Sequence, residues 1–553
     1  MNGNQLIGKK ESAEGSSTFN AINPISGETL EPAFHEATQE EINAALSLAK
    51  NATDFLRNST GSDRKRLLDA IADEMEADAD LIKNRVGEET GYPQPRLDGE
   101  FGRTVMQLRV FGKVAEEGDW VGARIDTAIP DREPLPKPDL RRMLVPVGPV
   151  VIFGASNFPL AISVAGGDPA SALAAGCPIV TKGHPSHPGS SELVARAVLR
   201  GVEKAGFPEG TFSMLQGATN ETGKALVEHP DTCAVAFTGS LKGGRALFDI
   251  ASSRPNPIPV YAEMGSVNPQ FVFSGKLGAD PAQFAESLFG SVTMGNGQFC
   301  TCPSMVFVPE GDDLSKMSER YLELVGESQG AALLNPGIAN AFSQGIDQWR
   351  AIDGVEVLAE GSLEGTEVGA APVVAKVSLE DFKKSGKQIF GFISNPSKLD
   401  YLVYSVCDQI YMNPSGSLML NGLASEQMFF AEALEKYGIG VQVIRVGEFK
   451  GAVEPFISTE FSEENKVQIT RLLELRWQDY LETVCENRKI QKAVCTHNRR
   501  ERQMGCPGRR FDLVPWPERR TERRVRGEAN SDRAGVSVWS RDGRPFPGAC
   551  PHY

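Results

Sequence analysis

The fold is decided by the stretch Pro146–Lys182, which reads PVGPVVIFGASNFPLAISVAGGDPASALAAGCPIVTK. Val150–Phe153 is a short apolar run that predicts a buried strand, and Gly154–Asn157 predicts a tight turn after it. Pro159 suits the first turn of a helix, and the small residues that follow let such a helix pack closely on a sheet. A second apolar run, Pro178–Thr181, predicts the next strand. This order is typical of a βαβ unit with two parallel strands.

The same order recurs further along the chain. Cys233–Phe237 is another apolar run, Thr238–Ser240 predicts a turn, and Lys242–Gly244 opens another helix. Upstream, Thr38–Glu41 is a capping box followed by apolar residues at helical spacing, and Ser62 can cap a second helix. Strands that alternate with helices predict an α/β fold with a doubly wound parallel sheet.

Length and composition are those of an ordinary globular enzyme. With 553 residues, 41% of them hydrophobic, the chain has room for about three or four domains. No apolar run reaches the roughly 18 residues that cross a bilayer, and the N-terminus lacks an apolar signal core, so we expect a cytoplasmic protein without a transmembrane segment. Nine scattered cysteines favour free thiols over disulfides.

Three short motifs carry the candidate chemistry: Gly154–Pro159 (GASNFP), Ala262–Pro269 (AEMGSVNP) and Gly297–Cys300 (GQFC). In this order, and together with Lys182 at a strand end and the Phe-Thr-Gly-Ser turn that ends at Ser240, they resemble the aldehyde dehydrogenase superfamily. The resemblance covers about residues 1–375. Three stretches are most similar to the α-ketoglutaric semialdehyde dehydrogenase branch, namely 139–143, 163–168 and 237–246.

This resemblance implies NAD(P)-dependent oxidation of a small aldehyde, such as 2,5-dioxopentanoate, to the carboxylate. Hydride transfer requires the aldehyde carbon to become tetrahedral first, and a thiolate adds readily and later leaves, which is the role implied for Cys300. The oxyanion then needs a preorganised donor, which matches the Asn157 amide. Hydrolysis of the resulting thioester needs a base for water, which matches Glu263.

Helix-terminus physics and the resemblance together indicate the cofactor contacts. Backbone N–H groups at the Ser240 turn can face a pyrophosphate, and Lys182 matches the family lysine at the adenosine ribose. The resemblance extends the predicted cofactor contacts to Gly239, Phe153 and Gly265. NAD-preferring relatives carry a glutamate where this chain has Pro185, so we expect NADP to be accepted at least as well as NAD.

Each of these residues also has a structural interpretation. Cys300 and Cys302 could be small buried apolar side chains, and Asn157 could cap the following helix. Glu263 could be a surface charge at a strand end, and Lys182 a solvated charge. Because all of these residues match the same family, the catalytic interpretation is favoured. None of the three motifs requires a metal.

The resemblance ends near residue 377. The family's Glu-x-Phe motif at the nicotinamide ribose, the end of its catalytic domain and the C-terminal strand that joins a neighbouring subunit are not recognisable beyond that point. Residues 1–262 therefore correspond to the N-terminal and dinucleotide-binding part, and 263–377 to a partial catalytic domain. The resemblance therefore leaves the oligomeric state open, and a nicotinamide misplaced by about 1 Å can cost on the order of a hundredfold in rate.

Residues 378–490 resemble a second family, signal peptide peptidase A or protease IV, which has a crotonase-like α/β fold. The stretches 380–386, 407–416 and 445–456 carry this resemblance. It implies that Lys450 is the general base of a Ser-Lys dyad, because burial lowers the pKa of an ammonium group. The family's serine belongs to a later repeat that does not follow here, so an inert remnant is the favoured interpretation of Lys450.

Residues 491–553 are rich in arginine and proline and lack any periodicity that would bury a face, so we expect a disordered basic tail. The whole chain has a net charge of −15, and no aromatic stacking platform accompanies the arginines, so no nucleic-acid partner is expected. Three functional hypotheses follow: an aldehyde dehydrogenase, a fragment of a signal peptide peptidase, and an inactive chimera.

Overall fold

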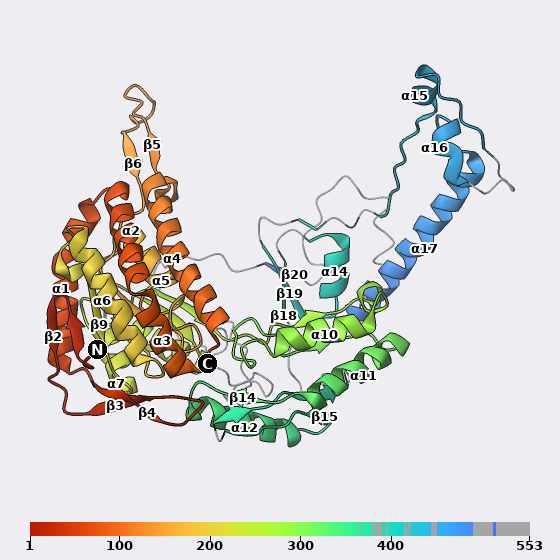
Figure 1. Cartoon of the computed structure of the whole chain (residues 1–553). Helices are drawn as coiled ribbons and strands as arrows, with labels where there is room; N and C mark the ends of the chain where they lie inside the picture. Colours follow the sequence, from red (N-terminus) through yellow and green to blue (C-terminus); the bar gives the residue numbers. More distant parts are fainter. Residues whose placement is uncertain are drawn as a thin grey trace, which may run out of the picture. The chain divides into compact units, whose positions relative to one another are not determined.

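The computed structural model describes residues 1–366, 368–378, 381, 390–393, 396–413, 417, 418, 420, 422–443 and 451–489, with the backbone of 513–515. Two compact units make up the chain, one containing residues 1–378 and the other beginning at Leu379 (Figure 1). Within the described residues, no helix is both long and apolar enough to cross a bilayer.

A seven-stranded sheet forms the centre of the first unit, in the order β11-β10-β7-β8-β9-β1-β2. Its strands are β1 (Gln5–Ile7), β2 (Lys10–Ser12), β7 (Val150–Phe153), β8 (Ile179–Lys182), β9 (Phe212–Leu215), β10 (Ala234–Gly239) and β11 (Val260–Met264). β7 to β11 are parallel to one another, and β1 and β2 add an antiparallel edge next to β9.

Helices cover both faces of this sheet, as predicted for a doubly wound fold. One layer contains α2 (Gly61–Ala77), α3 (Ala79–Thr90), α4 (Gln94–Glu117), α5 (Gly167–Ala174) and α6 (Pro188–Lys204), and the other contains α1 (Gln39–Asn58), α7 (Asn220–Glu228) and α8 (Leu241–Ser253). Val150 and Ile152 belong to the core under the first layer, whereas Val151 and Phe153 belong to the core under the second. Because side chains alternate along a strand, a continuously apolar strand is buried on both faces.

Smaller elements complete this part of the unit. They are two antiparallel hairpins, β3 (Thr18–Ile22) with β4 (Thr29–His35) and β5 (Arg124–Asp126) with β6 (Leu140–Arg142), and the 3-10 helices η1 (Asp119–Val121) and η2 (Glu209–Thr211).

Two local predictions differ from the structure. The helix expected to begin near Pro159 begins at Gly167, because the Glu100 carboxylate accepts from the backbone N–H groups of Leu160 (2.8 Å) and Ala161 (3.1 Å) and holds this segment as a loop. The second N-terminal helix is capped by Thr60 rather than Ser62, since the Thr60 hydroxyl accepts from the backbone of Asp63. The capping box at Thr38 is confirmed.

The remainder of the first unit consists of short strands and helices. Its elements are β12 (Gln270–Phe271), α9 (Ser274–Leu277), α10 (Pro281–Val292), β13 (Val306–Phe307), α11 (Asp312–Glu327), β14 (Ala331–Ala332), α12 (Pro336–Arg350), β15 (Val355–Glu360), β16 (Gly369–Ala370) and β17 (Val373–Val377). The strands pair two by two, β12 with β13, β14 with β16 and β15 with β17, and a small core around Leu288 lies between α10 and α11.

The second unit has its own small core around Tyr401 and Ile410. Its elements are β18 (Phe390–Ile393), α14 (Lys398–Tyr404), β19 (Gln409–Met412), α15 (Ala431–Lys436), η3 (Gly451–Val453), α16 (Glu454–Ile457), α17 (Glu463–Asn487) and β20 (Leu513–Pro515). β20 lies within the tail for which disorder was expected, and it pairs in parallel with β19, because its apolar residues suit a strand. The rest of that tail lies outside the described residues.

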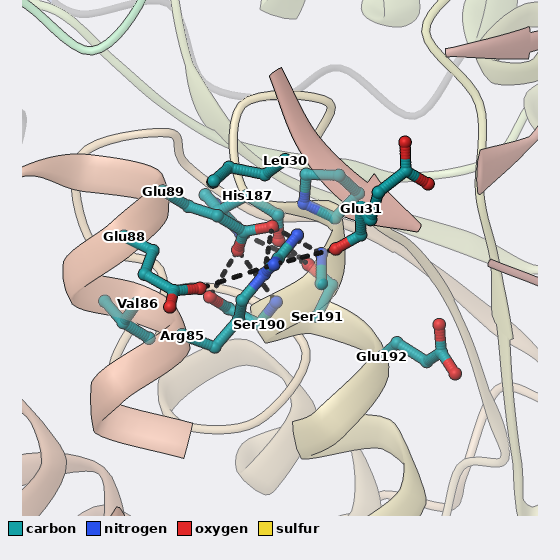
Figure 2. Close-up of polar contacts among 12 residues, drawn as sticks. Leu30, Glu31, Arg85, Val86, Glu88, Glu89, His187, Ser190, Ser191 and Glu192 are labelled. Atoms are coloured by element: carbon teal, nitrogen blue, oxygen red, sulfur yellow. Dashed lines mark hydrogen bonds and ion pairs between the residues drawn. The ribbon is translucent and has the colours of Figure 1, made fainter. Parts of the chain in front are cut away.

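A buried carboxylate joins α3 to the start of α6 (Figure 2). The Glu89 side chain accepts from the backbone N–H groups of Gly189 and Ser190, each at 2.8 Å, and from the Ser190 hydroxyl at 2.5 Å. The Arg85 guanidinium donates to the same carboxylate at 3.1 Å and to the Glu31 carbonyl at 2.9 Å. Glu89 therefore accepts hydrogen bonds from the N-terminal N–H groups of α6 and also neutralises the charge of the buried Arg85.

Glu89→Ala should lower the free energy of unfolding by about 3–5 kcal/mol, because it removes the buried counter-charge of Arg85 and leaves two helix N–H groups without partners. Glu88→Ala is the matched control: Glu88 also pairs with Arg85, at 3.4 Å, but its side chain is 54% exposed, so we expect about 1 kcal/mol or less. Urea unfolding followed by fluorescence measures both variants. Equal destabilisation by the two substitutions would contradict this account.

Candidate functional site

One cavity of the first unit contains the three predicted catalytic residues. Its volume is about 10 Å³, and it is lined by Ala155, Asn157, Phe158, Ile162, Thr238, Gly239, Glu263, Met264, Gly265 and Cys300. Except for Cys300, these residues lie at or after the carboxyl ends of β7, β10 and β11, which are adjacent parallel strands. Parallel strands of a doubly wound sheet bring their carboxyl ends to one edge, where ligands bind.

The Cys300 loop is anchored by polar side chains on both sides of the nucleophile. The Asn268 amide donates to the carbonyls of Cys300 (2.7 Å) and Cys302 (3.1 Å). On the other side, the buried Gln298 side chain accepts from the backbone N–H of Leu334 at 3.1 Å. These anchors fix the backbone that carries the thiol.

Electrostatics around the Cys300 thiol favour its neutral form. Burial raises the pKa of the thiol, and the nearby Glu263 carboxylate raises it further, while its own backbone N–H and Arg103 act in the opposite direction. Burial and the charge of Glu263 likewise raise the pKa of Asp168, at the start of α5. Glu263 is thus close enough to influence two ionisable groups around the cavity.

Asn157 is almost fully buried and is held at both ends. Its side-chain amide donates to the Gln298 carbonyl at 2.7 Å, and its own carbonyl accepts from the Tyr92 hydroxyl (3.1 Å) and from Arg96 (2.6 Å). The Arg96 guanidinium also lies over the rings of Tyr92 (3.5 Å) and Phe299 (4.5 Å). Asn157 does not cap a helix, because the next helix begins ten residues later, at Gly167.

A buried histidine supports the same loop from the other side. His187 Nε2 lies 3.1 Å from the Ala155 carbonyl, and because a carbonyl only accepts, this nitrogen carries the ring proton. Burial lowers the pKa of His187 to about 4, so the ring is neutral near pH 7. Neither His187 nor Arg96 stood out in the sequence, because their partners are backbone carbonyls that no residue pattern reveals.

The sheet edge offers one helix N-terminus suited to a dinucleotide phosphate. The N-termini of α6 and α7 already bind carboxylates: Glu89 at α6, and Glu36 at α7, where it accepts from the backbone of Ala218 and Thr219. Among the described residues, the side chain that caps α8 is the uncharged Ser240 hydroxyl, which accepts from Gly243 at 3.1 Å. The positive end of the α8 dipole is therefore not neutralised by a local anion.

Two glycines lie where there is little space for a side chain at the start of α8. A Cβ atom at Gly239 would lie 2.7 Å from the Phe237 ring, and one at Gly244 would lie 2.7 Å from the Met264 sulfur. A side chain at either position would press on one of these groups, so glycine leaves room for a group that approaches the α8 backbone closely.

The remaining predicted cofactor residues lie apart from the cavity. Lys182 ends β8 and donates to the Gly217 carbonyl, and burial lowers its pKa to about 8, opposed by the charge of Glu36. Phe153 is buried in the core and packs near Phe237, with ring centroids 6.5 Å apart, so its ring does not line the cavity. Lys450, predicted as a peptidase-like base, lies outside the described residues.

Comparisons with known proteins bear out both resemblances. A family model described as the aldehyde dehydrogenase family matches residues 11–391, and one described as peptidase family S49 matches residues 381–501. The chain is 44% identical over 383 residues to alpha-ketoglutaric semialdehyde dehydrogenase 2 of Azospirillum brasilense, covering 69% of this chain and 73% of that protein.

The C-terminal part is similar to a second protein, and the fold of the first unit is similar to solved structures. The chain is 32% identical over 181 residues to Protease 4 of Haemophilus influenzae, but this match covers 33% of the chain and 29% of that protein. A crystal structure of an NAD-dependent aldehyde dehydrogenase from Sinorhizobium meliloti matches with a TM-score of 0.57 and 26% identity, covering 68% of this chain and 73% of that one. The chain belongs to the aldehyde dehydrogenase family, an NAD(P)-using oxidoreductase family, and carries a C-terminal segment similar to peptidase family S49.

Proposed function

We propose that this chain oxidises the semialdehyde of a small dicarboxylic acid, of the 2,5-dioxopentanoate type, to the corresponding carboxylate with NAD(P) and water. The observation that carries the proposal is the cavity shared by Cys300, Asn157 and Glu263. The semialdehyde class is supported by the 44% identity to a relative with that name.

Cys300 is the proposed nucleophile. Its thiolate forms a bond to the aldehyde carbon, and the carbonyl electron pair moves onto oxygen to give a thiohemiacetal anion. One N–H of the Asn157 amide donates to the Gln298 carbonyl, and an amide has a second N–H that can donate to this oxyanion. The Cys300 backbone N–H is the second proposed donor.

Glu263 is the proposed base of the second half-reaction. A bound nicotinamide cofactor supplies the hydride acceptor that converts the thiohemiacetal into a thioester. Glu263 then removes a proton from water, the resulting hydroxide adds to the thioester carbon, and the Cys300 sulfur leaves. Both side chains line the same cavity, which supports the proposal that the attacking water lies between them.

The proposed cofactor contacts begin at the N-terminus of α8, which no nearby carboxylate of the described residues neutralises. Ser240 and Gly239 are proposed to contact the pyrophosphate there, Gly265 to lie near the nicotinamide end, and Lys182 to contact the adenosine ribose. Pro185 supplies no carboxylate to repel a 2′-phosphate. We therefore propose that NADP is accepted at least as well as NAD.

Cys300→Ser should lower kcat for 2,5-dioxopentanoate by about 1000-fold or more, because the hydroxyl is a far weaker nucleophile. Cys302→Ser is the matched control, two residues away in the same loop, and should stay within about threefold of the parent chain. NAD(P)H absorbance measures all three proteins. Similar rates for the parent chain and Cys300→Ser would remove Cys300 from the mechanism.

Alkylation of Cys300 by iodoacetamide should become faster with rising pH, through a midpoint above the usual thiol range, because the thiolate is the reactive form and burial raises the thiol pKa. Glu263→Gln removes a negative charge beside the sulfur, so its midpoint should lie at lower pH. Glu286→Gln, which instead affects an exposed ion pair with Arg320, should leave the midpoint unchanged. Mass spectrometry with peptide fragmentation separates alkylation of Cys300 from that of Cys302. An unchanged midpoint in Glu263→Gln would contradict the arrangement.

Pro185→Glu should lower kcat/KM for NADP by about tenfold or more relative to NAD, because it places a carboxylate near the 2′-phosphate.

In the parent chain, the NADP preference should fall as pH rises through about 8, where Lys182 loses its charge. Initial rates with both cofactors between pH 7 and 9 test this. A parent chain that strongly prefers NAD would refute the proposal.

A further inference from the structure

Four residues of α4 form one stripe that faces the catalytic loop. Arg96, Glu100, Arg103 and Gln107 are spaced three or four residues apart, so their side chains leave the same face of the helix. Arg96 binds the Asn157 carbonyl, and Glu100 binds the backbone of Leu160 and Ala161. Both side chains are therefore occupied in holding the loop.

Arg103 is the charged residue of this stripe that does not bind the backbone of the catalytic loop. It is exposed, and within the described part of the chain no carboxylate lies at ion-pair distance from it. Its guanidinium lies 5.5 Å from the centre of the Phe158 ring. Phe158 lines the catalytic cavity and packs on Phe299, next to Cys300, with ring centroids 5.0 Å apart.

The cavity needs a cation if its substrate is an anion. Burial and the Glu263 carboxylate raise the pKa of both Asp168 and the Cys300 thiol, and the reacting sulfur is a thiolate, so an incoming carboxylate meets negative charge around the cavity. Arg103 lies near enough to act on the Cys300 sulfur with the opposite sign. A guanidinium stacked on an aromatic face keeps its N–H edge available for a bidentate contact with a carboxylate.

We propose that Arg103 binds the distal carboxylate of an ω-oxo acid while its aldehyde carbon lies at Cys300, and so selects anionic over neutral aldehydes. The inference rests on the proposed dehydrogenase function and assigns the residue that recognises its substrate class. Phe158 acts with Arg103 by supporting the guanidinium and separating the carboxylate from the sulfur.

The test compares two aldehydes of equal length, 5-oxopentanoate and pentanal, in the full chain. Arg103→Met should lower kcat/KM for 5-oxopentanoate by roughly 10- to 100-fold, the range expected for a lost hydrogen bond to a charged group. Pentanal should change by less than about threefold, and Arg103→Lys should fall between, because lysine keeps the charge but loses the fork. Arg109→Met is the control on the same helix, since Arg109 pairs with Asp73 and Glu76, and it should leave the ratio of the two aldehydes unchanged. An equal loss for both aldehydes in Arg103→Met would overturn the proposal.

A binding measurement keeps the test decisive if the chain oxidises neither aldehyde, an outcome that would refute the dehydrogenase function. Glutarate, the product expected from 5-oxopentanoate, is titrated into the parent chain and into Arg103→Met by calorimetry. Affinity at least about tenfold weaker in the variant supports Arg103 as the carboxylate ligand. Equal affinity in the two proteins, or no binding to the parent chain, overturns it.

Discussion

The hydrogen bond from the Asn157 amide to the Gln298 carbonyl joins the two parts of the dehydrogenase unit at the point where the chemistry is proposed. Asn157 belongs to the loop after β7, and Gln298 precedes Cys300 by two residues. The contact is buried, so breaking it would leave a polar group without water or protein partners, at a cost of roughly 1–3 kcal/mol. Everything proposed for Cys300 depends on this loop and the β7 loop staying together.

Buried carboxylates arrange the rest of the sheet edge around that contact. Glu100 accepts hydrogen bonds from the segment after Asn157. Glu89 accepts from the backbone at the start of α6, and Glu36 does the same at the start of α7. Each replaces water at backbone N–H groups that would otherwise lack partners. By occupying two helix N-termini, they leave α8 as the terminus at which a phosphate would meet an unneutralised dipole.

The sequence predicted the parallel sheet, because apolar runs and turn residues are local patterns, and the family resemblance of three short motifs implied that Asn157, Glu263 and Cys300 share one site. It did not predict the loop over residues 158–166, which depends on a carboxylate from α4 about sixty residues away. For the same reason Tyr92, Arg96 and Arg103 were missed: their partners lie on other elements, and no spacing along the chain reveals them. The burial of the Phe153 ring against Phe237 was not predicted either, and its role as a cofactor contact stays a prediction.

Trapping the acyl group tests the central claim most directly. With Glu263→Gln, NADP and 2,5-dioxopentanoate, thioester hydrolysis should be slow, so the acyl group should accumulate on the enzyme. Tryptic digestion and fragmentation distinguish Cys300 from Cys302 within one peptide. The account predicts an acyl adduct on Cys300; NADPH formation with the adduct on another residue, or with no adduct at any time, would contradict it.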